Sequence, residues 1–99
     1  MLKKDDMKPG TKVRIKVLKD GVPCSGDFNA ENCVSIFTFK NGQMGFWSQL
    51  HVGDQLLILQ GPKKVGPEHR INAVNVKLVG KKVVGFIYWC SLRASGELI

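Results

Sequence analysis

A strict two-residue alternation near the N-terminus constrains the fold more than any other feature of the chain. Residues 11–18, TKVRIKVL, interleave apolar and cationic side chains: Val13, Ile15 and Val17 with Lys12, Arg14 and Lys16. Because successive side chains of a strand point to opposite faces, the pattern predicts a strand with one buried and one solvated face. No stretch of ten or more residues repeats apolar side chains at helical spacing, so we expect no substantial helix.

Turn-forming residues divide the rest of the chain into short strands. Asn41-Gly42 predicts a type I′ hairpin turn between strands at 33–40 and 43–47, since both residues tolerate positive φ angles. A second hairpin is expected between strands at 71–79 and 83–89, with Val79-Gly80-Lys81-Lys82 as its turn. The same signals give the other elements: strands at 56–59, ending at Gly61-Pro62, and at 97–99, and loops at 20–32 and 63–70. These elements predict an all-β barrel or sandwich.

The length of 99 residues suits one domain and is too short for two separate cores. Residues 1–8 are polar and lack periodicity, which predicts a flexible, basic N-terminal arm before a single barrel domain at 9–99. No apolar run approaches the roughly 20 residues of a membrane helix, and no apolar targeting segment follows Met1. Three cysteines at no disulfide spacing favour a cytoplasmic protein.

Aliphatic side chains on the apolar sides of these strands are expected to form most of the core. They are Val13, Ile15, Val17, Ile36, Leu57, Leu59, Val74, Val76, Leu78 and Ile87. Fully burying each large aliphatic chain contributes roughly 1.5–3 kcal/mol, which in sum suits a domain that stands without disulfides.

Charge is the feature that says most about partners. Fifteen Lys and Arg against eight Asp and Glu give a net charge of +7. Such a surplus favours polyanions, so we expect nucleic acid (DNA or RNA) or an acidic protein as the partner, and no membrane.

The cations fall into two groups of candidate binding residues. Lys12, Arg14 and Lys16 lie in a row about 6.6 to 7 Å apart, which suits contacts along a phosphate backbone; an edge strand whose lysines block aggregation has the same pattern. The second group occupies two loops: Lys63, Lys64, His69 and Arg70 in one, and Lys81 and Lys82 in the other. Whether these loops merge into one patch is open at this point.

Strands rich in aromatic residues have a second apolar face, outside the core, that something must cover. Phe37 and Phe39, like Phe86 and Tyr88, alternate with apolar residues, so both faces of their strands are apolar. The long loop, a partner subunit or a ligand are the alternatives for the cover. Trp47 and Tyr88 are the expected exposed contacts, since aromatic residues are favoured at binding sites.

Catalytic signatures are missing from the sequence. No serine lies in a Gly-x-Ser-x-Gly context, and the glycines form no phosphate-binding loop. The pairs Cys24 and Cys33, and His51 and His69, have no zinc-site spacing. We therefore expect a protein that is not an enzyme and holds no metal or cofactor.

The order of elements over residues 50–99 resembles the later part of an SH3-like barrel. Gly53-Asp54 precedes the apolar strand QLLIL, GPKKVGPEHR occupies the variable loop, and NAVNVKLVGKKVVGFIYW forms the distal hairpin. Gly85-Phe86 lies where bacterial SH3 domains commonly carry Gly-Trp, and SLRA and ELI match the short turn and last strand. The resemblance implies an all-β, small SH3-like barrel with an inserted loop and an extra hairpin in the N-terminal half.

Two functions are compatible with these features. Basic SH3-like barrels of the ribosomal and transcription-factor kind are the nearer analogy, because the acidic loop and Tyr-rich first strand of proline-peptide readers are missing. The first hypothesis is therefore a nucleic-acid binding module. The alternative is a protein-binding adaptor or inhibitor, of the phage accessory type, that docks on an acidic partner protein. A weaker third hypothesis is a homodimer that pairs through an open strand edge.

Overall fold

The computed structural model describes residues 2–18, 34–40 and 43–99, without the side chains at 40, 43, 44, 46, 47 and 67. The elements in chain order are η1 (Lys4–Asp6), β1 (Lys12–Ile15), β2 (Ser35–Lys40), β3 (Gln43–Gln49), β4 (Gln55–Val65), η2 (Pro67–His69), β5 (Ile71–Leu78), β6 (Val83–Tyr88), α2 (Trp89–Ser95) and β7 (Gly96–Leu98). The predicted turn at Asn41-Gly42 and the predicted loop at 20–32 lie outside the described residues. The two strands that flank the turn, β2 and β3, are described.

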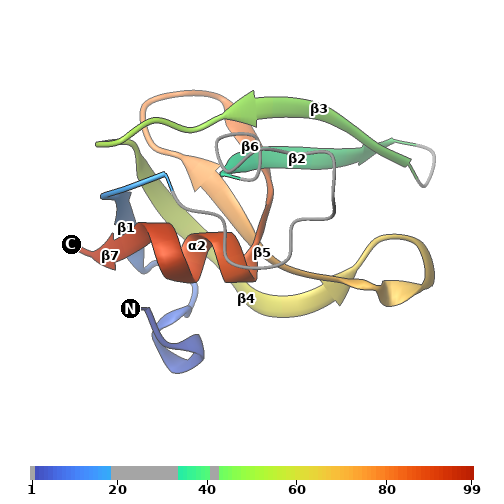
Figure 1. Cartoon of the computed structure of the whole chain (residues 1–99), viewed down its shortest axis with the longest axis horizontal. Helices are drawn as coiled ribbons and strands as arrows, with labels where there is room; N and C mark the ends of the chain where they lie inside the picture. The colour runs from blue at the N-terminus through green and yellow to red at the C-terminus, as the bar shows by residue number, and fades with distance from the viewer. Residues whose placement is uncertain (1, 19–33, 41–42) are drawn as a thin grey trace.

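The strands form one curled antiparallel sheet in the order β3-β2-β6-β5-β4-β1-β7. Figure 1 shows the sheet curving like part of a barrel, with α2 in the foreground; α2 contacts β5, β6 and β7. The all-β prediction is therefore confirmed, and the expected 71–79/83–89 hairpin is present as β5 and β6. The short turn expected at SLRA is a single α-helix of seven residues.

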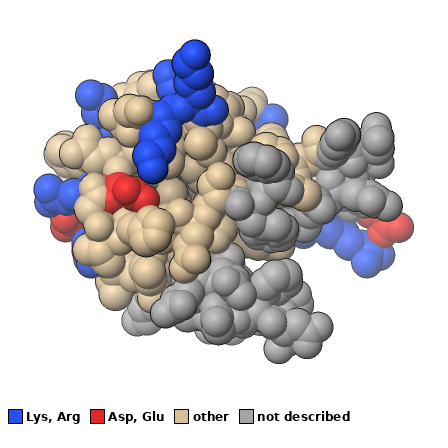
Figure 2. All heavy atoms as spheres, turned by 90° about the horizontal axis from the view of Figure 1, so that it is seen from above, with Lys and Arg blue, Asp and Glu red and all other residues tan. Residues whose placement is uncertain are grey.

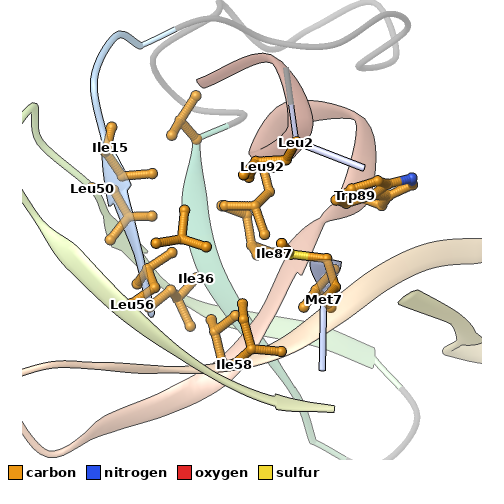
Figure 3. Packing of buried hydrophobic residues seen from close by; sticks show 14 of the residues in the cluster. Leu2, Met7, Ile15, Ile36, Leu50, Leu56, Ile58, Ile87, Trp89 and Leu92 are labelled. Atoms are coloured by element: carbon orange, nitrogen blue, oxygen red, sulfur yellow. The ribbon is translucent and has the colours of Figure 1, made fainter. Parts of the chain in front are cut away.

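The inner face of the curl holds the main core (Figure 3), which combines β-strand residues with Leu92 of α2 and Leu50. Seven of the ten predicted core residues are buried: Val13, Ile15, Ile36, Val74, Val76, Leu78 and Ile87. Alternation thus located the buried face of β1, β5 and β6 correctly.

The prediction of burial was wrong for the other three residues. Leu57 and Leu59 are only half-buried, and their neighbours Leu56 and Ile58 are the buried residues of β4. A continuous apolar run has no polar phase, so the sequence did not show which alternate set faces inward. Val17 is 41% exposed because β1 ends at Ile15.

Beyond Ile15 the chain turns away from β4. The backbone N–H groups of Lys16 and Val17 both donate to the carbonyl of Ser95, at 2.8 and 3.3 Å. This contact with the end of α2 replaces the sheet pairing that the alternation had predicted up to residue 18. The predicted strand is therefore four residues long instead of eight.

The N-terminal segment is packed on the core, in contrast to the loose arm predicted for residues 1–8. Leu2 and Met7 are both buried in the main core, on either side of the single turn η1. The N–H of Gly10 donates to the carbonyl of Ile58, and the N–H of Ile58 donates to that of Thr11, both at 2.8 Å. Backbone pairing with β4 therefore begins before β1 itself.

Strand β4 continues through Gly61-Pro62, where the sequence predicted its end. The pairing with β5 shifts register between Ile58 and Gln60 and again between Gln60 and Lys63. Proline lacks an N–H and is tolerated at such irregular positions. The predicted loop at 63–70 therefore shrinks to the residues around η2, and Lys63 and Lys64 belong to the strand.

Candidate functional site

The outer face of the sheet carries a row of residues that spans four strands. Lys12 on β1 pairs with Leu57 on β4, Leu57 pairs with Lys77 on β5, and Lys77 pairs with Val84 on β6. Paired residues share a face, so these four side chains, here named the basic row, stand side by side. Both lysines are exposed, and Val84 is 48% exposed. With strands about 4.8 Å apart, the two lysine Cα atoms are about 10 Å apart.

The side chains of Lys12, Arg14 and Lys16, predicted as one row, have different surroundings in the structure. Glu97 Oε1 accepts hydrogen bonds from Arg14 Nη2 at 2.7 Å and from Arg14 Nε at 3.1 Å. Lys16 lies past the end of β1 and lines a hollow with Asp6. Lys12 alone keeps the predicted arrangement, and beyond the paired Arg14 its cationic neighbour on the same face is Lys77, two strands away.

Sequence reasoning missed Lys77. Its signal was available, because Lys77 occupies the polar position between the buried residues Val76 and Leu78. What the sequence did not give was the register between β1, β4 and β5, which places Lys77 one strand beyond Leu57 from Lys12.

The two basic loops do not merge. Lys81 and Lys82 lie in the turn that follows β5, whereas Lys63, Lys64 and Arg70 lie at the opposite end of that strand. Seven residue steps along β5 separate these ends by about 24 Å. The turn lies beside the Leu78 end of β5, so the cations gathered there are Lys12, Lys77, Lys81 and Lys82.

Cations at the far end are already engaged with neighbours. Lys63 Nζ donates to Gln60 Oε1 at 2.6 Å, and Arg70 forms an ion pair with Glu68. The loop between them holds Glu68 and His69 at φ values of 58° and 51°. Of the positive charges at this end, that of Arg70 is therefore offset by Glu68, whereas the partner of Lys63 is a neutral amide.

An aromatic cluster adjoins the basic row on the same outer face. It consists of Phe37, Phe39, Phe86 and Tyr88, supported by Val65, Ile71 and Ala73. The Phe37 ring lies 5.1 Å from that of Tyr88 and 6.1 Å from that of Phe86, centroid to centroid. Phe86 follows Val84 by two residues on β6, so the cluster continues the row at its Val84 end.

Tyr88 was predicted as an exposed contact and is half-buried within this cluster. Burial raises the pKa of its phenol above the usual 10.0, and an electrostatic interaction with the neighbouring Cys90 adds to the increase. Trp47 lies in β3, and its side chain is outside the described part of the structure.

Figure 2 shows Lys and Arg side chains standing mostly around the margin of the face it presents, with uncharged residues over much of its centre. Among residues 2–18, 34–40 and 43–99, no three His, Cys, Asp or Glu side chains lie close enough to hold a metal ion. His51 Nδ1 lies 3.7 Å from Asp54 Oδ2 on the surface.

No helix in the described ranges has the length and apolar character needed to cross a membrane. No protein-family model, curated protein or solved structure matches the chain. Any inference about function therefore rests on the geometry of the chain itself.

Proposed function

We propose that this protein is a non-enzymatic module that binds nucleic acid across the outer face of its sheet. The basic row carries the proposal, because two exposed lysines flank Leu57 on adjacent strands with no acidic residue between them. Lys81 and Lys82 extend the positive charge at the neighbouring turn. The order of the last elements, a hairpin, a short helix and a final strand, supports a likeness to basic SH3-like barrels.

Lysine contacts of this kind favour the phosphate backbone over the bases. A lysine ammonium is a flexible point charge, and contacts with phosphates fix position without reading sequence. The half-buried Leu57 and the exposed Val84 offer apolar surface between and beside these charges. We therefore propose sequence-tolerant binding, with the polynucleotide running from Lys12 across β4 and β5 toward the aromatic cluster.

Fluorescence anisotropy with a labelled single-stranded oligonucleotide tests this function. A probe of about 16 nucleotides covers the larger known footprint of a small β-barrel. Affinity should fall steeply between about 50 and 200 mM salt, and the Lys12→Ala/Lys77→Ala variant should reduce the log–log salt slope by about 1.4, since each single-strand phosphate contact contributes about 0.7.

Lys63→Ala/Lys64→Ala is the matched control, because it removes the same charge at the far end of β5. It should change the slope by clearly less than the Lys12/Lys77 pair. Weak binding that ignores salt, or equal losses from both pairs, would refute a site on the basic row. Duplex and RNA versions of the probe, measured in parallel, identify the preferred polynucleotide.

A further inference from the structure

A separate hollow lies between the N-terminal segment and α2, away from the basic row. It is open, has a volume of about 620 Å³, and is lined by Leu2, Lys3, Lys4, Trp89 and Arg93. Trp89 and Arg93 are four residues apart on α2, so their side chains are neighbours on one helix face. Leu2 is buried in the main core and anchors the other wall.

The chemistry of this lining is one-sided. Its polar side-chain groups are hydrogen-bond donors: two lysine ammonium groups, a guanidinium and the indole N–H. The nearby Asp6 carboxylate accepts the backbone N–H of Lys3 at 3.2 Å and lines a different hollow with Lys16. The remaining lining is apolar: the aliphatic stems of Lys3, Lys4 and Arg93, with the small exposed parts of Leu2 and of the Trp89 ring. An occupant must therefore bring negative charge and an apolar group together.

Trp89 is placed to contribute to both kinds of contact. The residue is 9% exposed, and Figure 3 shows its indole nitrogen turned away from the labelled core side chains. The ring edge is thus available to a ligand while the rest of the side chain is fixed by the core.

We propose that this hollow docks a short acidic segment of another protein, held by one apolar side chain. The apolar side chain lies against Leu2 and Trp89, and flanking carboxylates pair with Lys3, Lys4 and Arg93. A guanidinium binds a carboxylate through two parallel hydrogen bonds, and Trp and Arg are the residues most enriched at interface hot spots. This docking site is independent of the nucleic-acid site.

The openness of the hollow favours a protein segment over a small molecule. Small-molecule sites enclose most of the ligand surface, about 70–90%, and five residues around an open hollow do not. A protein segment needs only a short anchor here: one apolar side chain and the carboxylates that flank it. Charge complementarity then selects acidic partners and speeds their association.

Two-dimensional ¹⁵N NMR of the indole N–H signals tests the proposal directly. The probe is a blocked peptide, Gly-Glu-Glu-Leu-Glu-Glu-Gly, and Trp47→Phe identifies which of the two indole signals belongs to Trp89. The peptide should shift the Trp89 signal saturably, and Arg93→Ala should weaken its affinity about tenfold, as expected for losing hydrogen bonds between charged groups.

Control peptides and variants separate docking from general attraction to a basic protein. Replacing the four Glu by Gln, or the Leu by Ser, should abolish the Trp89 shift. Lys64→Ala removes the same charge as Arg93→Ala at the far end of β5 and should leave peptide affinity within about twofold, as is usual for a remote, screened surface charge.

Three results would overturn the proposal: control peptides that bind as well as the probe, equal losses from Arg93→Ala and Lys64→Ala, or an oligonucleotide that shifts Trp89 more tightly than the peptide at equal salt. Lys12→Ala/Lys77→Ala should leave peptide binding unchanged. Failure at the basic row and failure at the hollow are therefore distinguishable.

Discussion

Leu56 and Leu57 are adjacent and chemically identical, and the register of β4 places them on opposite faces. Leu56 is 0% exposed within the main core, whereas Leu57 is half-buried between Lys12 and Lys77. Truncating a fully buried leucine to alanine costs about 2–5 kcal/mol, because a cavity adds to the lost transfer energy. Leu57 has only part of its side chain removed from water, so Leu57→Ala should cost about 1 kcal/mol.

For a domain of this size each kcal/mol lowers Tm by about 4–8 °C. Taking about 3 kcal/mol for Leu56→Ala, its Tm should fall by about 12–24 °C, against about 4–8 °C for Leu57→Ala. Urea unfolding followed by tryptophan fluorescence measures the same difference as free energies, and similar m values would show that both variants unfold alike. If Leu57→Ala costs as much as Leu56→Ala or more, Leu57 is not on the outer face and cannot lie at the centre of the basic row.

Two further predictions test the packing around β6. Gly85→Ala should destabilise by about 1–3 kcal/mol or more through overpacking, because a Cβ there would lie 2.5 Å from the Phe37 carbonyl oxygen; Gly45→Ala, with open space at its Cβ, is the control in thermal denaturation. Tyr88 is the sole tyrosine, so tyrosinate absorbance reports it alone and should show a pKa above 10.0. Because the folded state holds this proton more tightly than the unfolded state, its contribution is complete below the unfolded pKa and is lost as pH rises through the folded pKa. A wild-type stability that is flat across this alkaline range, or identical in Tyr88→Phe, would contradict the burial of the ring.

Local pattern predicted well wherever polar and apolar residues alternate. Val13 and Ile15 on β1, and Val74 and Val76 on β5, are buried as expected, since a misplaced polar neighbour would have to enter the core. The turn at Val79-Gly80-Lys81-Lys82 was likewise readable, because Gly80 adopts a positive φ of 86° that favours glycine. These features depend on residues close in sequence.

Errors arose where long-range contacts decide the outcome. The run Leu56 to Leu59 is apolar throughout, so only pairing with β1 and β5 determines which residues face the core. Leu2 and Met7 show no period, and a single turn of η1 lets both reach the same core. Neither feature can be predicted from a few neighbouring residues of the sequence.

The candidate site was predicted in part for the same reason. Lys12, Lys81 and Lys82 were identified from sequence and lie at one end of β5, but Lys77 emerged only from the strand register. Arg14 was counted as a free cation, although Glu97 approaches it from β7, which is 83 positions away in sequence. Charge along a sequence therefore overestimates the charge that a surface offers.

The placement of the free cations also favours one path for a bound polynucleotide. A polynucleotide running along β5 would leave Lys77, cross the uncharged stretch at Asn75 and Ala73, and reach Arg70, which is paired with Glu68. A polynucleotide running across the sheet instead meets Lys12 and Lys77, whose Cα atoms are about 10 Å apart, and then the aromatic cluster. Because released counterions set the salt dependence, the crossing path confines the loss of slope to substitutions at Lys12, Lys77, Lys81 and Lys82. A slope that responded equally to Lys64 would instead place the polynucleotide along β5.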